Sequence, residues 1–246
     1  MTPFDPNEIT STPYLAPLVA DLPIRMRDTE ILTIVYRTDQ AASQRLLPEP
    51  LRPTSDLVVM HVYWMHDAEW FGVYGESAWQ LPTETPDGVP AVYSPFLFLD
   101  SDGAVATGRE VYGQPKKGGE VALEARGDLV VGVVRRNGIE IATSTIVYKQ
   151  QTAPADALDQ LIPGSGTNVN LRVLTDSQGA VRRELVTRQF ADVVHKEQWT
   201  GPATLELRPN AQAPVFLLPV REVVLGLHRK LDLTLGPASV VHTYGR

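Results

Sequence analysis

The sequence GREVYGQPKKGGE, residues 108–120, decides how the rest of the chain is interpreted. Apolar, strand-like segments flank it, and Pro115 fixes the backbone just before two adjacent lysines. Only three other lysines occur, at positions 149, 196 and 230. A lysine becomes a nucleophile when its pKa falls, whereas an arginine does not at neutral pH. The pair Lys116–Lys117 is therefore a candidate for covalent chemistry, with a solvated turn as the alternative explanation of the dipeptide.

Short segments rich in β-branched and aromatic residues recur along the chain, a pattern typical of strands. Pro residues in segment 1–24 predict an extended arm, and Asn137-Gly138 predicts a hairpin turn. Helices are expected at 40–47, capped by Asp39, and at 155–161. We expect a single mainly β domain, residues 1–246, folded as an antiparallel barrel or sandwich. The predicted strands are 31–36, 57–65, 70–80, 92–99, 104–112, 121–125, 129–134, 139–148, 170–174, 184–195, 203–207, 222–227, 231–235 and 240–244.

Side chains alternate between the two faces of a strand, and this alternation has two consequences here. In segment 57–65 both faces are largely apolar, so this strand is expected to be covered on both sides. Consecutive Lys116 and Lys117 point to opposite faces, so their ammonium groups are expected to lie apart. Desolvation should then supply most of any lowering of the lysine pKa.

The composition excludes several classes of function. A net charge of −7 argues against a nucleic-acid surface, and the chain has no cysteine for disulfides or thiolate chemistry. No apolar run approaches the roughly 20 residues that span a bilayer, and the N-terminus lacks the pattern of a signal peptide. We expect a cytoplasmic protein without a membrane or nucleic-acid partner. His61 and His66 lack a third ligand at metal spacing, so no metal is expected.

The order Gly-Arg-Glu, spacer, Pro-Lys-Lys resembles the acetoacetate decarboxylase family. Further matching segments run nearly end to end: 34–39, 48–51, 65–67, 74–77, 199–202 and 218–224. The resemblance implies a mostly antiparallel β-barrel or cone, a homo-oligomer, and no metal or organic cofactor. It also implies that Lys116 forms the Schiff base, that Lys117 is the cation that helps to lower its pKa, and that Glu76 is an active-site carboxylate.

The sequence departs from the family pattern at three positions. Thr29 stands where the decarboxylases carry an arginine, and Arg27 could replace that arginine if the loop shifts. His61 stands where a second carboxylate is found, and we expect it to titrate near neutrality. Gln114 stands where an aromatic residue is found. Together with Tyr112, these residues are the candidates for substrate contact.

Three functions remain open on these grounds. The first is a Schiff-base lyase that decarboxylates a small β-keto acid such as acetoacetate. The second is an aldolase-dehydratase that condenses pyruvate with an aldehyde through the same lysine. The third is a non-catalytic small-molecule binding module, against which the retention of Lys116, Lys117 and Glu76 argues. A small keto acid is the expected partner in the first two cases.

Overall fold

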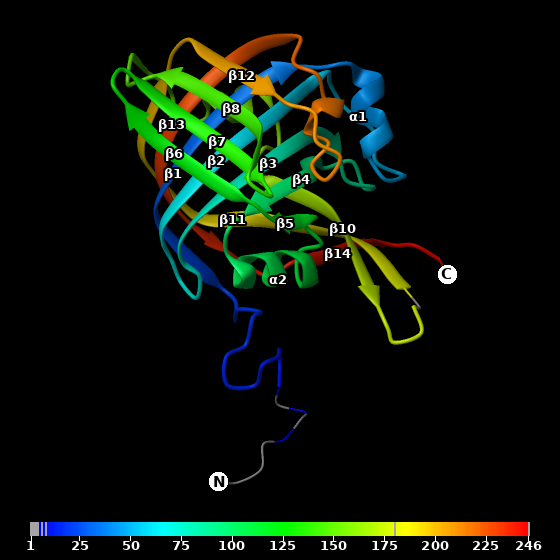
Figure 1. Cartoon of the computed structure of the whole chain (residues 1–246). Helices are drawn as coiled ribbons and strands as arrows, with labels where there is room; N and C mark the ends of the chain where they lie inside the picture. Colours follow the sequence, from blue (N-terminus) through cyan, green and yellow to red (C-terminus); the bar gives the residue numbers. More distant parts are fainter. Residues whose placement is uncertain (1–4, 6, 8, 180, 246) are drawn as a thin grey trace.

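The computed structural model describes residues 5, 7, 9–179 and 181–245, and most of them lie in two sheets (Figure 1). The larger sheet has the strand order β10-β11-β13-β1-β2-β3-β4-β5, and an additional pairing of β10 with β4 closes it on itself. Two short strands, β9 and β14, pair with β11. The bounds are β1 Ile24–Arg37, β2 Leu57–Ala68, β3 Gly72–Glu84, β4 Pro90–Leu99, β5 Lys116–Gly118, β9 Gln151–Thr152, β10 Thr167–Thr175, β11 Val181–Thr200, β13 Glu222–Leu235 and β14 Ser239–Thr243.

The predicted mainly β architecture is confirmed, with local differences in strand direction and strand bounds. The pairs β4–β5 and β10–β4 are parallel, whereas the other strand pairs are antiparallel. The strands predicted separately at 222–227 and 231–235 form one continuous strand, β13. The closed sheet creates an interior, which holds the candidate site.

A four-stranded sheet packs against one face of the larger sheet, in the order β12-β8-β7-β6 (Figure 1). Its strands are β6 Glu120–Arg126, β7 Leu129–Arg136, β8 Ile139–Val147 and β12 Ala203–Leu207. Gly132 lets the two layers approach, since a Cβ there would lie 2.8 Å from Val62 Cγ2. Asn137 and Gly138 both have positive φ, 53° and 72°, which confirms the predicted hairpin turn between β7 and β8.

Strand β2 shows how the alternation of side chains separates two cores. Met60 and Val62 lie in the core between the two sheets, whereas Tyr63 and Met65 belong to the core inside the closed sheet. His61 points to the interior as well and is 3% exposed. The prediction that this strand is covered on both sides is therefore confirmed. A shift of the β2 register by one residue would exchange the side chains that face the two cores.

Three α-helices occur in the described residues: α1 Gln40–Leu46, α2 Asp102–Glu110 and α3 Ala157–Leu161. The predicted helices at 40–47 and 155–161 are confirmed. Asp39, expected to cap α1, makes no side-chain cap bond, because its carboxylate pairs with Arg221 at 2.7 Å instead. None of the described helices is long and apolar enough to cross a membrane.

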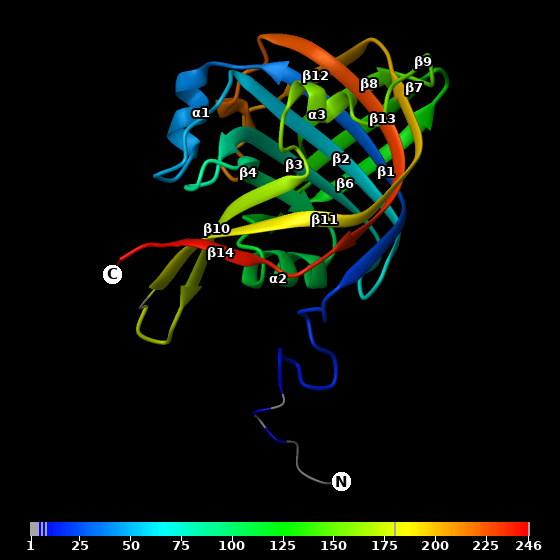
Figure 2. The same ribbon diagram turned by 180° about the vertical axis from the view of Figure 1, so that it is seen from behind.

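The prediction of a strand at 104–112 is wrong, because most of this segment forms helix α2. Ser101 caps the helix, its Oγ accepting a hydrogen bond from the backbone N–H of Ala104 at 3.4 Å. The buried residues Ala104, Thr107 and Gly108 are spaced three and four apart, which is the spacing of a helix face. Residues 9–23 form neither helix nor strand, as expected for the arm, and Figure 2 shows this segment leading away beside α2.

Candidate active site

The two lysines of the central motif lie on the three-residue strand β5, which runs parallel to β4. Lys116 is buried, whereas Lys117 is exposed. The ammonium of Lys117 donates to the backbone carbonyl of Gln212 at 3.2 Å. The predicted opposite orientation of the pair is confirmed, and the role of Lys117 as a tuning cation stays a prediction.

The residues before Lys116 hold its side chain in place. A Cβ on Gly108 would lie 2.3 Å from Lys116 Cδ, so α2 passes the lysine at a distance that only glycine permits. Arg109 Nη1 donates to the backbone carbonyl of Lys116 at 3.2 Å. Gly113 has φ +66°, and a Cβ there would lie 2.5 Å from the backbone nitrogen of Arg172. Gly108 therefore leaves space for the Lys116 side chain, and Gly113 lets the motif pack against the backbone of Arg172.

Lys116 forms a buried ion pair with Glu76. The Nζ atom lies 2.9 Å from Glu76 Oε2, and the two side chains are only 7% and 9% exposed. Glu76 comes from β3 and Lys116 from β5, on either side of β4. Removing either partner would leave an uncompensated buried charge, which costs several kcal/mol. The sheet thus brings together two of the three residues that the sequence analysis assigned to catalysis, Lys116 and Glu76, whereas Lys117 lies outside.

This ion pair faces a small inner chamber of about 40 Å³. Gln114, Asn168 and Arg188 supply the other polar groups of its wall. The remaining walls are apolar or aromatic and consist of Met26, Tyr63, Met65, Tyr74, Ala78, Leu97, Phe190, Leu233 and Leu235, with Gln80 at the junction to a second chamber. The chamber therefore offers one amine, one carboxylate and one guanidinium in a largely apolar setting.

Arg188 of β11 is the polar group that sequence analysis missed. It is 6% exposed, and its Nε and Nη1 atoms are buried without a partner among the described residues. Its guanidinium carbon lies 4.2 Å from the ring centroid of Phe190 and 5.5 Å from that of Tyr112. Burial lowers the pKa of Arg188 from its usual value, but an arginine still keeps its proton in proteins. The chamber therefore contains a cation with donors to offer.

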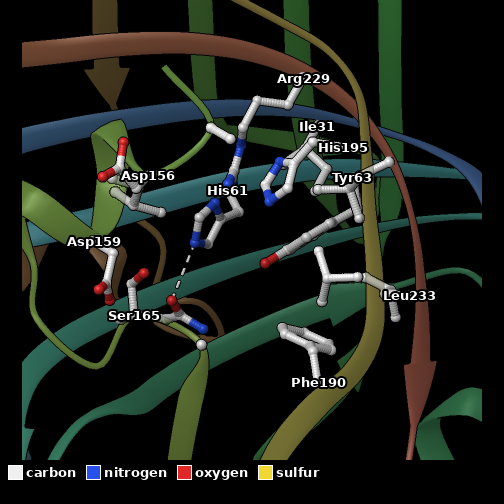
Figure 3. A pocket seen from close by; sticks show the side chains of 16 residues that line it. Ile31, His61, Tyr63, Asp156, Asp159, Ser165, Phe190, His195, Arg229 and Leu233 are labelled. Carbon is white, nitrogen blue, oxygen red and sulfur yellow. Dashed lines mark hydrogen bonds between the residues drawn. The ribbon is translucent and has the colours of Figure 1, made fainter. Parts of the chain in front are cut away.

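A larger outer chamber of about 370 Å³ adjoins the inner one (Figure 3). The walls of both include Tyr63, Gln80, Phe190 and Leu233. His61, His195 and Arg229 contribute polar groups to the outer chamber, and Ile31, Leu158, Val193 and Leu231 contribute apolar ones.

A chain of hydrogen bonds runs along the wall of both chambers. Arg229 Nη2 donates to Thr33 Oγ1 at 3.0 Å, and Thr33 Oγ1 lies 2.9 Å from His61 Nδ1. His61 Nε2 lies 3.1 Å from Gln80 Oε1, and Gln80 Nε2 donates to Asn168 Oδ1 at 3.2 Å. Since the amide oxygen of Gln80 can only accept, the histidine proton resides on Nε2, and Nδ1 of the neutral ring accepts from the threonine hydroxyl. The chain ends at Asn168 Nδ2, which has no partner among the described residues.

His61 is neutral in this chain. Burial, with a smaller effect from Arg229, lowers its pKa to about 3. The expectation that His61 titrates near neutrality is therefore wrong, because the side chain is removed from water and lies near a cation.

The other predicted residues divide between the chamber and its surroundings. Gln114 lines the inner chamber, and Tyr112 lies behind Arg188, its hydroxyl donating to the carbonyl of Gly236 at 2.8 Å. Thr29 is fully buried on β1 but lines neither chamber.

Arg27 does not replace the missing arginine, because its side chain lies on the outside. It pairs there with Asp67 at 3.0 Å and with Glu69 at 2.9 Å. Within the described residues, no group of three His, Asp or Glu side chains is arranged to hold a metal ion.

Comparisons with known proteins identify the family and the fold. The family model for acetoacetate decarboxylase matches residues 11–245. The chain belongs to this family. An acetoacetate decarboxylase of Acidiphilium cryptum is 38% identical over 245 residues, which is 98% of this chain and 99% of that protein. A solved acetoacetate decarboxylase structure superposes with a TM-score of 0.91 at 33% identity, covering 98% of both chains.

Family membership confirms the resemblance seen in the sequence and the cone-like closed sheet, and it identifies the chain as an enzyme of the carboxy-lyase type. A more distant structure, at 18% identity and a TM-score of 0.78, is an enduracididine biosynthesis enzyme bound to the condensation product of pyruvate and imidazole 4-carboxaldehyde. The two structures match over 96% of this chain and 97% of the other. That likeness shows a shared fold.

We predict that Gly108→Ala lowers kcat at least about tenfold, because the added methyl displaces Lys116 from its attacking position. The helix itself should tolerate alanine, which has the higher helix propensity. Gly103→Ala, the same change in the first turn of α2, serves as the control and should retain activity. Steady-state kinetics and thermal unfolding of both variants provide the test. Unchanged kcat in Gly108→Ala would show that Lys116 can be positioned without this close approach.

A second prediction concerns stability at acid pH. The pKa of His61 is about 3 in the folded protein and 6.5 in the unfolded chain. Between these two pH values the unfolded state therefore binds a proton that the folded state does not. This contribution to stability is complete above pH 6.5 and declines as the pH falls towards 3. Between pH 7 and pH 5 the loss amounts to about 2 kcal/mol.

His61→Gln should remove this component, because glutamine can accept from Thr33 and donate to Gln80 without titrating. Urea unfolding at pH 7 and pH 5 measures the difference. An equal loss of stability in wild type and variant would contradict the assignment.

Proposed function

We propose that the protein decarboxylates a small β-keto acid through an imine on Lys116. The observation that carries this proposal is a buried amine, paired with a carboxylate, in the same chamber as an arginine that forms no ion pair with a described residue. Family membership and relatives named acetoacetate decarboxylase support the same reaction.

The reaction begins with a proton transfer across the 2.9 Å contact from Lys116 Nζ to Glu76 Oε2, which yields a neutral amine. The amine attacks the ketone carbon, and the carbinolamine loses water to give a protonated imine. This imine accepts the electron pair of the bond to the carboxylate as carbon dioxide leaves. The resulting enamine takes up a proton at carbon, for which Glu76 is the nearest acid, and water releases the ketone product.

Arg188 is the group that we assign to the substrate carboxylate. A guanidinium with unsatisfied N–H groups can receive a carboxylate by charge-assisted hydrogen bonds. Too strong a bond would stabilise the substrate and slow the loss of carbon dioxide. Packing of Arg188 on the Phe190 and Tyr112 rings fixes the position of the cation without an ion pair to a described residue, and the Glu76 charge only partly offsets the lowering of the Arg188 pKa by burial. Arg188 thereby binds the substrate carboxylate, the role that the family resemblance implies for an arginine at the position of Thr29.

The aldolase-dehydratase alternative uses the same imine. The outer chamber is the observation in its favour, because it has room for a second reactant beside the lysine. The relatives named acetoacetate decarboxylase, at 36–39% identity, favour decarboxylation, whereas the structure bound to a condensation product of pyruvate is 18% identical to this chain. The homo-oligomer, the cytoplasmic location and the single-domain organisation stay predictions.

The proposed reaction predicts that acetoacetate is converted with release of carbon dioxide. Borohydride reduction in the presence of acetone should fix an isopropyl group on Lys116, which peptide mass spectrometry would locate. Lys116→Arg should abolish both signals, while Lys230→Arg, at a partly exposed lysine, should retain them. Reduction onto Lys149 alone, or condensation of pyruvate with an aldehyde without any release of carbon dioxide, would refute the decarboxylase assignment.

The assignment of Arg188 predicts a selective loss. Arg188→Met should lower kcat/KM for acetoacetate by roughly 10- to 100-fold, the value of one or two charge-assisted hydrogen bonds. Imine trapping with acetone should change far less, because acetone has no carboxylate. Arg182→Met on the same strand, where the arginine is 61% exposed, is the matched control. Equal losses for acetoacetate and acetone would show that Arg188 supports the chamber rather than the carboxylate.

A further inference from the structure

The two chambers each contain a buried arginine. Arg188 lies in the wall of the inner chamber and Arg229 in the wall of the outer one. They are 6% and 8% exposed, and neither forms an ion pair with a described residue. Lys116, by contrast, is compensated by Glu76. The connected cavity thus has two cations without counter-ions.

Burying an unpaired cation is costly, so such a group signals a missing anion. Arg229 uses Nη2 to hold Thr33 Oγ1, and its Nε is buried without a partner among the described residues. Figure 3 shows its guanidinium beside His61 within the group of side chains that line the chamber. Its single bond to a neutral hydroxyl leaves the positive charge uncompensated.

The acidic residues of the outer chamber do not supply the counter-ion. Asp156 and Asp159 come from the α3 segment and are exposed to solvent. Asp156 accepts a hydrogen bond from Gln160 at 2.9 Å, and Asp159 accepts one from the backbone of Gly164 at 3.0 Å. In Figure 3 they lie on the side of the chamber away from Leu233 and Phe190, whereas Arg229 lies nearer to His61 and His195.

The space between the two arginines is suited to methylene groups. Tyr63, Phe190 and Leu233 line both chambers, and Ile31 and Leu231 extend the apolar wall towards Arg229. Burial raises the pKa of the Tyr63 hydroxyl well above its usual value, and the charges of Arg229 and Arg188 both oppose this. The hydroxyl of Tyr63 is therefore within electrostatic reach of both cations.

We propose that the natural substrate is a β-keto acid with a second carboxylate at the far end of an alkyl chain. This inference rests on the proposed decarboxylation and names its substrate class. Arg188 binds the carboxylate that leaves as carbon dioxide, Lys116 attacks the ketone, and Arg229 binds the carboxylate that the product retains. Acetoacetate, a monoanion, fills only the inner chamber and leaves Arg229 without an anion.

A pair of substrates of equal length tests the second anion site. 3-Oxoadipate and 3-oxohexanoate differ in the distal carboxylate alone, and 3-oxosuberate and 3-oxooctanoate repeat the comparison with two more carbons. The wild type should prefer the dianion at one or both lengths by at least about tenfold in kcat/KM. Arg229→Gln, which can still donate to Thr33, should reduce this ratio to about one, and Arg229→Lys should restore part of it.

Arg221→Gln is the matched control, because Arg221 is an exposed arginine paired with Asp39 outside the cavity, and it should leave the ratio unchanged. A purely structural role of Arg229 would lower kcat/KM for both members of a pair alike, and this outcome would overturn the proposal. Wild-type ratios of about one at both lengths would overturn it as well.

Binding of unreactive analogues separates this proposal from the proposed reaction. Calorimetric titration should show that adipate or suberate binds more tightly than hexanoate or octanoate, and that Arg229→Gln removes the advantage. If no β-keto acid is decarboxylated but this preference is found, the reaction is wrong and the two-anion site stands. If acetoacetate is decarboxylated but the dianions have no advantage in binding or turnover, the two-anion site is wrong and the reaction stands.

Discussion

The ion pair between Lys116 and Glu76 is the interaction on which the arrangement of the site depends. It joins two strands that are separated by β4, and it neutralises two charges in a place that water barely reaches. An amine that is never far from a carboxylate can lose its proton without solvent, and the same carboxylate can return a proton later. The rest of the motif serves this contact, because Gly108 and Arg109 fix the backbone and the methylene groups of the lysine.

The electrostatic balance of the cavity follows from this pair. Once Lys116 and Glu76 neutralise each other, each remaining buried charge must find its counter-ion in a ligand. His61 contributes to that balance, since burial keeps it neutral at a position where the family resemblance implies a carboxylate. The cavity is consequently more positive than its catalytic pair alone would make it.

Much of the fold could be predicted from the sequence, because alternation along β2 and the hairpin at Asn137-Gly138 are local signals. Helix α2 could not be separated from a strand, since its apolar residues fit both periods over so short a length. Lys116 and Glu76 were identified by motif. Arg188 and Arg229 were not, because their inward orientation depends on the phase of the alternation. For Arg188, bulges in β11 between Ala191 and Val194 and again between His195 and Glu197 reset that phase, and no sequence pattern records them. Arg229 alternates regularly with Leu231 and Leu233 on β13, so this alternation was a signal that could have placed it inside.

The one-way chain from Arg229 to Asn168 constrains how this enzyme can have diverged from its relatives. Every member donates to the next, and the chain has a single polarity because the Gln80 oxygen faces His61 and its NH2 group faces Asn168. A carboxylate at position 61 could only accept, and it would then face the carbonyl oxygen of Gln80. A carboxylate at position 61 would therefore require the Gln80 amide to flip, so that its NH2 group faces position 61. The Asn168 amide would then have to flip as well, to donate to the Gln80 oxygen. These five positions, on five different strands, are expected to have changed together in evolution. A protein in which only one of them carries the residue of its relatives should be less stable than a protein with all the residues of either kind.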